Sequence, residues 1–370
     1  MPPRTVLLLQ GGGALGSYQA GAFQALHERG YHPDWVAGVS IGAINASLIA
    51  GNPPDKAIDK LTAFWHRISK SRTPLGQVPA FMPDPLQQKI GAAETILFGQ
   101  PGFFRPRSPL EWMTPTGPLS YYDTQFLRTT LEELVDFDRI NSKHRHMRLS
   151  VGAVQIATGN MVYFDSNMMK IGPEHIMASG ALPPGFPPVA IDGEAYWDGG
   201  LVSNTPLQYL MSLEPLKNSL VFQVDLFSAR GKPPTTLDEV AEREKDIRYS
   251  SRTRTGTNDA TDKHNLRRHL IKFIEKLPPE MLADPVVKKL KEFACPTRID
   301  VVQLIYRPEI PQGSQKDYQF DRTTVTQRWA EGQHDAEVTI AAAPWNEPPG
   351  HHIGMRNFDV LFKRDKLQGI

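Results

Sequence analysis

Several residue types and patterns are scarce in this sequence, and each scarcity excludes a class of protein. Cys295 is the single cysteine, so an intramolecular disulfide and a cysteine-rich zinc site are both excluded. No apolar run approaches the ~18 residues of a membrane-spanning helix, and the N-terminal apolar run is too short for a signal peptide. The 41 Lys and Arg are balanced by 40 Asp and Glu, for a net charge of +1, so no basic field favours nucleic acid. We therefore expect a soluble, cytoplasmic protein with no nucleic-acid partner.

The chain does have enough apolar residues to build a large core. Hydrophobic residues make up 40% of its 370 residues and charged residues 22%, a composition typical of globular proteins rather than disordered ones. Its length corresponds to two domains or to one large α/β domain with additions.

Strand and helix patterns alternate over the first fifty residues. Short continuous apolar runs at 6–9 and 35–39 are typical of buried parallel strands, and helical patterns follow them at 17–29 and 41–50. This β-α-β-α order predicts a parallel sheet with helices on its faces.

The composition changes twice along the rest of the chain. Nine prolines between residues 73 and 118 predict a loop-rich insertion at about 71–118. After residue 229 the chain becomes more charged, and its patterns indicate mainly helices, with one strand at 299–306. We therefore expect a first domain at 4–229, which carries the insertion, and a helix-rich extension at 230–370 that packs on it.

A G-x-S-x-G motif lies between a predicted strand and a predicted helix. It reads Gly38-Val39-Ser40-Ile41-Gly42, and this strand–turn–helix context is the one that a nucleophile elbow requires. Gly38 and Gly42 keep a sharp turn free of side chains. The following helix directs its N-terminal N–H groups and the positive end of its dipole at Ser40.

A second glycine motif, Gly11-Gly12-Gly13-Ala14-Leu15-Gly16, allows two interpretations. It matches the G-x-G-x-x-G fingerprint of dinucleotide-binding proteins, in the required position after a strand. However, the acidic residue that should close the second strand is absent, because Ser40 stands there. Alternatively, the N–H groups of Gly12 and Gly13 form an oxyanion hole that faces Ser40.

A nucleophilic serine needs a base, and the histidines offer no clear candidate. None of the eleven lies in a loop of glycines and small residues. Asp198, followed by two glycines, is the best alternative, although an Asp-Gly pair is also a common turn.

Four motifs taken together resemble the patatin-like phospholipases. They are Gln10 to Gly16, Gly38 to Ala43, the Ala178-Ser179-Gly180-Ala181-Leu182-Pro183 segment with the prolines near 187, and Asp198-Gly199-Gly200. The resemblance covers roughly residues 4–210. It implies a three-layer α/β/α fold with a mostly parallel central sheet and a Ser–Asp dyad in place of a triad.

Carried over residue by residue, the resemblance makes Ser40 the nucleophile, Asp198 the base, and Gly11, Gly12 and Gly13 the oxyanion loop. It implies no metal and no cofactor. The sequence departs from many family members at two positions, with Gln10 before the glycines in place of Asp and Leu15 after them in place of Arg or Lys. Residues 230–370 resemble the C-terminal extension of a bacterial subgroup.

The expected activity is therefore acyl-ester hydrolysis of the phospholipase A or lysophospholipase type, with a lipid or acyl ester as substrate. An acyl-thioesterase or a polyester depolymerase would use the same dyad, and a dinucleotide-dependent oxidoreductase or a lipid-binding module stays open. The aromatic and basic Phe98–Arg107 loop either contacts a membrane surface peripherally or packs on the protein. The sequence leaves the oligomeric state open.

Overall fold

A mixed sheet forms the middle of the molecule. The computed structural model describes residues 3–70, 84–213, 216–308, 310–350 and 353–362, without the side chains of 84–88 and 251–254. The strand order is β11-β10-β9-β1-β2-β5-β8-β7, with β6 paired to β5. The strands are β1 (Arg4–Leu9), β2 (Trp35–Val39), β5 (Arg148–Gln155), β6 (Met161–Asp165), β7 (Val189–Ile191), β8 (Glu194–Asp198), β9 (Ser219–Asp225), β10 (Ile299–Ile305) and β11 (Met355–Phe358).

The sheet is parallel over most of its width and antiparallel at one edge. β11, β10, β9, β1, β2 and β5 run parallel, whereas β6, β7 and β8 pair antiparallel. Because the carboxyl ends of parallel strands meet at one edge, the loops after β1 and β2 lie side by side. The expected α/β class with a mostly parallel sheet is confirmed.

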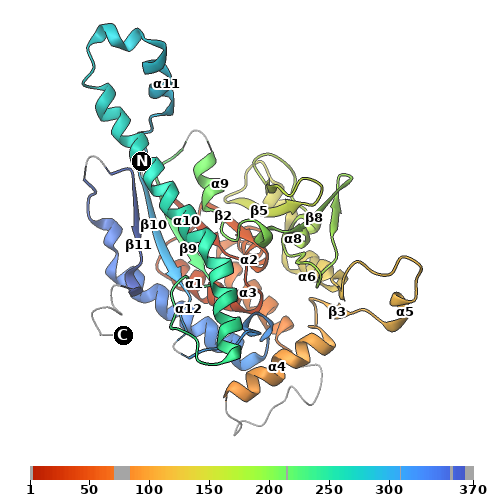
Figure 1. Ribbon diagram of the computed structural model, residues 1–370. Coiled ribbons are helices and arrows are strands. Elements are labelled where there is room, and N and C mark those ends of the chain that lie inside the picture. Colours follow the sequence, from red (N-terminus) through yellow and green to blue (C-terminus); the bar gives the residue numbers. More distant parts are fainter. Residues whose placement is uncertain (1–2, 71–83, 214–215, 309, 351–352, 363–370) are drawn as a thin grey trace.

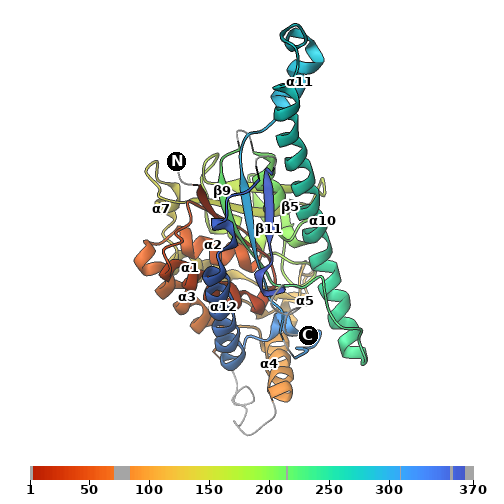
Figure 2. The ribbon, with the colours of Figure 1, turned by 90° about the vertical axis from the view of Figure 1, so that its left-hand side faces the viewer.

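Helices cover both faces of the sheet, as Figure 2 shows. Leu7 and Leu9 of β1 face one core, while Val6 and Leu8 face the other, because alternate side chains of a strand point to opposite faces. On the first face lie α1 (Gly16–Glu28), α2 (Ile41–Ala50), α3 (Pro54–Ile68), α6 (Gln125–Leu134), α8 (Pro173–Ser179) and α12 (Arg322–Ala342); on the second lie α9 (Leu207–Ser212) and α10 (Leu237–Ile274).

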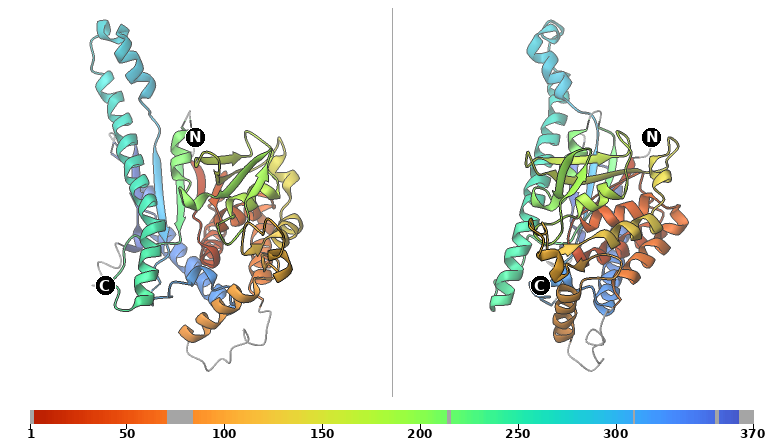
Figure 3. Two further views of the ribbon diagram at one scale, coloured as in Figure 1. Left: turned by 45° about the vertical axis from the view of Figure 1, so that its right-hand side comes forward. Right: turned by 90° about the vertical axis from the view of Figure 1, so that its right-hand side faces the viewer.

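The C-terminal third is joined to this sheet. β10 pairs with β9, and α12 packs lengthwise against α1. The far end of α10 and the following α11 (Pro285–Phe293) project beyond the sheet (Figures 1 and 3). The division into domains at residue 229 stays a prediction. No helix among the described residues is both long and apolar enough to cross a membrane.

The proline-rich region is more ordered than a loop. Residues 71–83 lie outside the described part of the chain, but the 15-residue helix α4 (Asp84–Phe98) occupies much of the rest. The expectation of a loop is wrong here, because Pro85 falls in the first turn of the helix, where proline is tolerated, and no proline follows before residue 101. A hairpin comes next, made of β3 (Arg105–Pro106), α5 (Pro109–Trp112) and β4 (Tyr122–Asp123).

Short elements complete the chain. They are α7 (Phe137–Asn141) and the 3-10 helices η1 (Gly13–Leu15), η3 (Gly199–Leu201), η4 (Pro279–Ala283), η5 (Lys316–Tyr318) and η6 (Pro344–Asn346).

Candidate active site

Ser40 occupies a sharp turn between β2 and α2. Its backbone has φ 56° and ψ −125°, in the left-handed half of conformational space that costs a non-glycine residue of order 1–3 kcal/mol. The turn is tight on both sides: a Cβ on Gly38 would clash with the Gly42 carbonyl, and one on Gly42 with the Leu9 carbonyl. Both predicted elbow glycines therefore stand where only glycine fits.

A buried serine holds the strained turn in place. The Ser40 N–H donates to Ser179 Oγ at 2.9 Å, and Ser179 Oγ donates to the Gly152 carbonyl at 2.6 Å. Ser179 ends α8 and is fully buried. The sequence contained this residue in the third of the four motifs, but the motif alone gave it no role.

Asp198 lies beside Ser40 at the end of β8. Its side chain is 2% exposed, accepts a hydrogen bond from the Gly200 N–H at 2.7 Å and lines the same pocket as Ser40. Burial raises the pKa of Asp198 to about 6, and the neighbouring Ser40 hydroxyl and the Gly200 N–H oppose that rise. The carboxylate is therefore a stronger base than an exposed Asp.

The glycine loop after β1 contributes two backbone donors. The Gly11 N–H donates to the Asn204 carbonyl at 3.3 Å, and Asn204 Nδ2 donates to the Gly11 carbonyl at 3.0 Å, so Gly11 is fixed in place. None of the described residues accepts a hydrogen bond from the Gly12 or Gly13 N–H. Both glycines line the same pocket as Ser40, so their donors are available to a bound group.

The Gln10 side chain holds the glycine loop in place through buried hydrogen bonds. Its Oε1 accepts hydrogen bonds from the N–H groups of Leu226, at 2.6 Å, and Phe227, at 3.1 Å. Its Nε2 donates to Thr205 Oγ1 at 3.2 Å. A buried amide, which both donates and accepts, thus ties the glycine loop to the end of β9.

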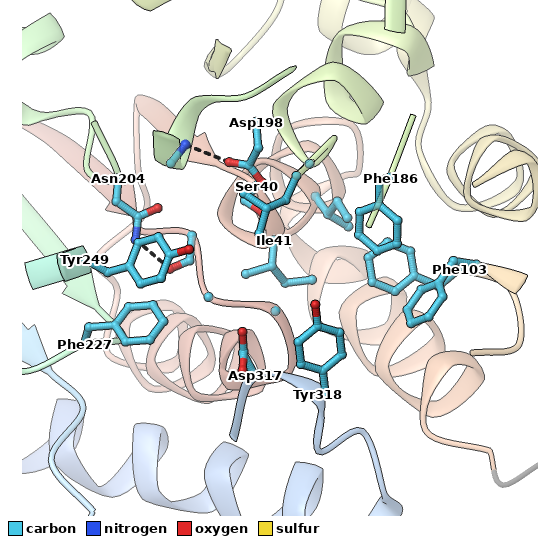
Figure 4. A pocket seen from close by; sticks show the side chains of 18 of the residues that line it. Ser40, Ile41, Phe103, Phe186, Asp198, Asn204, Phe227, Tyr249, Asp317 and Tyr318 are labelled. Carbon is cyan, nitrogen blue, oxygen red and sulfur yellow. Dashed lines mark hydrogen bonds between the residues drawn. The ribbon is translucent and has the colours of Figure 1, made fainter. Parts of the chain in front are cut away.

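These groups line one pocket that is partly open to solvent. Figure 4 shows Ser40 and Asp198 at one end and aromatic rings around the rest. Most of its wall is apolar or aromatic, and the side chains concerned are Ile41, Ile44, Phe103, Phe104, Leu182, Phe186, Phe227, Tyr249, Tyr318 and Phe320.

Part of this wall comes from the C-terminal third, which the sequence could not assign to the site. Tyr249 lies on α10, and Asp317 and Tyr318 lie on η5. Burial raises the pKa of Tyr318 to about 12 and also raises that of Tyr249, so both phenols stay neutral near pH 7. Asp317 is paired with Lys245 at 2.7 Å.

The Phe98–Arg107 loop packs inward. Phe103 and Phe104 are buried, with ring centroids 5.3 Å apart, and both line the pocket. The loop is expected from the sequence either to contact a membrane or to pack on the protein. Phe103 and Phe104 pack on the protein, so these two rings are not available to a membrane.

The described residues offer no metal site and no histidine near Ser40. No group of three His, Cys, Asp or Glu side chains in this part of the chain could hold a metal ion. The described residues that line the pocket include no histidine. Two carboxylates line the pocket, Asp198 and Asp317. Asp317 is paired with Lys245, whereas Asp198 lies beside Ser40.

Known proteins show related sequences. Residues 7–211 match the family model described as patatin-like phospholipase, and residues 247–352 match one described as patatin phospholipase. A patatin-like phospholipase domain-containing protein of Caenorhabditis elegans is 41% identical over 59 residues, which are 16% of this chain and 4% of that protein. The chain thus spans a small fraction of the curated relative it matches.

Solved structures show more distant similarity. VipD from Legionella pneumophila is 15% identical, with 92% of this chain and 67% of that chain covered and a TM-score of 0.38. The type III effector protein ExoU is 14% identical, with 92% and 53% covered and a TM-score of 0.36. Human GIVD cytosolic phospholipase A2 is 12% identical, with 60% and 40% covered and a TM-score of 0.28.

The first family model covers more than half of the sequence, and its match spans the glycine loop, the Ser40 turn and Asp198. The chain belongs to the patatin-like phospholipase family.

Proposed function

We propose that this protein is a serine acyl-ester hydrolase of the phospholipase A or lysophospholipase type, which releases fatty acid through an acyl-Ser40 intermediate. The observation that carries the proposal is the placement of Ser40 beside the buried carboxylate of Asp198, in one pocket with the unengaged N–H groups of Gly12 and Gly13. A nucleophile, a base and two oxyanion donors around one space are the components that acyl transfer requires.

The proposed reaction has two steps. Asp198 takes the Ser40 proton as Oγ attacks the ester carbonyl, and the oxyanion is bound by the Gly12 and Gly13 N–H groups. Collapse of this intermediate expels the alcohol, which takes the proton from Asp198, and leaves acyl-Ser40. Asp198 then deprotonates a water that attacks the acyl carbonyl, which releases the fatty acid and regenerates Ser40.

The pocket wall supports a lipid acyl chain as the substrate part that lies beside Ser40. Phe103, Phe104, Phe186 and Phe320 provide apolar surface that water leaves when an acyl chain enters. Acyl-thioesterase and polyester depolymerase activities use the same groups and stay as alternatives. Dinucleotide binding is less well supported, because β2 ends at Val39 and Ser40 follows it, where an acidic residue should bind the ribose.

Fatty-acid release from a substrate panel tests the proposal. The panel contains phosphatidylglycerol, phosphatidylcholine, their lyso forms, an acyl-CoA and a short p-nitrophenyl ester. We expect release that Ser40→Ala abolishes. The matched control is Ser47→Ala, since Ser47 lies on the same helix α2, its hydroxyl donates to the Ile44 carbonyl, and it is not among the residues that line the pocket. Equal activity in Ser40→Ala and wild type would refute the assignment.

A further inference from the structure

The hairpin from Arg105 to Asp123 projects from the body of the molecule, at the right of Figure 1. β3 and β4 form its base, where Arg105 faces Asp123 and Pro106 faces Tyr122. The short helix α5 lies toward its tip.

This hairpin exposes large apolar side chains at an unusual density. Leu110, Met113 and Leu119 are 76%, 79% and 75% exposed, and Trp112 and Tyr121 are about half exposed. Soluble proteins rarely expose so many large apolar side chains within so short a segment. Such a patch usually marks a surface that binds a partner or a membrane. Trp and Tyr, with an apolar ring and a polar edge, are the residues that concentrate at membrane interfaces.

The charged side chains of the hairpin neutralise one another. Arg105 pairs with Glu111 at 3.1 Å and with Asp123 at 2.8 Å, and Arg107 pairs with Glu111 at 2.9 Å. Glu111 also accepts a hydrogen bond from the Ser108 N–H, and that bond, with those from Arg105 and Arg107, lowers the pKa of Glu111 to about 2. Two cations and two anions leave the hairpin without net charge at any pH near neutrality.

The base of the hairpin contacts residues that line the pocket and the segment beside them. The Tyr121 and Tyr122 N–H groups donate to the carbonyls of residues 184 and 185, at 3.0 and 2.9 Å. The Tyr122 ring packs against Phe104 and Phe186, and both of these rings line the pocket. The base of the hairpin therefore adjoins the aromatic side of the pocket.

We propose that the hairpin of residues 105–123 inserts its apolar tip into the interface of a zwitterionic lipid bilayer and so places the pocket beside the membrane. The proposal rests on the proposed function, because a lipid hydrolase must meet its substrate at a bilayer. The internally paired charges favour a neutral surface, since neither an anionic bilayer nor a charged protein partner would find an unpaired charge on the hairpin.

Binding of the full chain to phosphatidylcholine vesicles tests this proposal. Flotation is measured for wild type, for Leu110→Ser/Met113→Ser/Leu119→Ser, and for the control Leu237→Ser/Met168→Ser/Ile310→Ser. The control changes one Met and two aliphatic residues of similar exposure elsewhere on the molecule. We expect the hairpin variant to bind at least about tenfold more weakly and the control to bind as wild type. Binding should change little between low and high salt.

A probe within the hairpin provides a second measurement. Vesicles of brominated phosphatidylcholine should quench part of the tryptophan fluorescence, and Trp112→Phe should remove that part. Absence of quenching, or equal binding of both triple variants, would overturn the proposal. Binding that needs anionic lipid and disappears in salt would also overturn it, as would an oligomer of the wild type that the hairpin variant alone dissociates.

The two proposals fail in different ways. If the docking proposal is wrong, the hairpin variant hydrolyses vesicle phospholipid as wild type does. If it is right, the variant keeps its Ser40-dependent hydrolysis of a short soluble ester but loses at least about tenfold on vesicles. If the hydrolase assignment is wrong, Ser40→Ala changes no hydrolysis, while vesicle binding by the Ser40→Ala protein still tests the hairpin.

Discussion

At the residue scale, the site is built from groups that cost stability. Ser40 has a strained backbone, and Asp198 is a carboxylate with little access to water. A buried carboxylate with a raised pKa is destabilised when it ionises, yet only the ionised form can accept a proton from Ser40. Stability and activity therefore depend in opposite directions on the Asp198 charge.

This opposition predicts the behaviour of Asp198→Asn. Activity should fall by orders of magnitude, and wild-type kcat/KM should decline below pH 6, where Asp198 gains a proton. Because the folded pKa is raised from 3.8 to about 6, the folded state binds this proton more tightly. The free energy of unfolding therefore falls as pH rises through that range.

The Asp198→Asn variant has no buried carboxylate to ionise and so does not lose stability as the pH rises. It should be more stable than wild type at pH 7.5, by on the order of 1–3 kcal/mol, and less so at pH 4.5. Urea unfolding at both pH values measures the difference. A variant that is less stable than wild type at pH 7.5, or a pH–rate profile that is flat from pH 5 to 8, would contradict the raised pKa as the cause.

Replacing Ser179 should lower kcat while leaving KM nearly unchanged. Ser179→Ala leaves the Ser40 N–H and the Gly152 carbonyl without their partner, which frees the strained turn. We expect kcat to fall by about 10–100-fold with KM and the pH profile nearly unchanged, and the free energy of unfolding to fall by about 1–3 kcal/mol. Steady-state kinetics and urea unfolding measure both effects.

Ser166→Ala is the matched control for that experiment. Ser166 Oγ likewise accepts a backbone N–H, from Leu149 at 3.0 Å, in a buried position. Its loss should lower stability by a similar amount without lowering kcat. If both variants lose kcat equally, Ser179 acts through stability alone and does not position Ser40.

At the scale of elements, the close crossing of α1 and α12 connects the two ends of the chain. A Cβ on Gly21 of α1 would clash with the Trp329 carbonyl, and one on Gly332 of α12 with the Tyr18 carbonyl. α1 begins directly after the glycine loop, and η5 precedes α12 by a few residues and contacts η1. The helix crossing therefore sets where Tyr318 lies over the pocket.

Gly332→Ala should disturb this crossing. The added methyl meets backbone that cannot rotate away, so we expect a loss of about 1–3 kcal/mol of stability and lower activity. The control is Gly256→Ala, also within a helix, where the added methyl meets the end of the flexible Gln208 side chain and Ala favours the helix by about 1 kcal/mol. Thermal unfolding of both variants measures the contrast. Equal stabilities would mean that the crossing can relax.

How much of each element could be predicted depends on how local its signal is. The apolar runs at 6–9 and 35–39 predict the strands that the structure has at Arg4–Leu9 and Trp35–Val39. The Ser40 turn could be predicted because its glycine requirement is local. By contrast, the helix Asp84–Phe98 was missed, because the prolines around it were counted without regard to their positions. The contribution of Tyr318 to the pocket depends on how α12 packs on α1, which no short pattern encodes.

At the scale of the whole molecule, one sheet runs through both predicted domains. β9 is the last strand of the first predicted domain. β10, in the second, pairs with β9 over its full length, from Ile299 opposite Ser219 to Ile305 opposite Asp225. Val301 of β10 belongs to the same core cluster as Val6 and Trp35. This pairing could not be predicted from the sequence, because no local pattern indicates which strands pair when they lie far apart along the chain.

This continuity predicts that both parts unfold together. Val301→Ala removes two methyl groups from a fully buried site and should cost about 1–3 kcal/mol. In one cooperative unit, hydrogen exchange then accelerates by the same factor in β1 and β2 as in β10, because all three open in the same global event. Val286→Ala, on the exposed surface of the projecting α11, should leave exchange in the sheet unchanged. Faster exchange confined to residues after 229 would instead mean that this part opens independently. The Ser40 pocket would then lose the wall formed by Tyr249, Asp317, Tyr318 and Phe320.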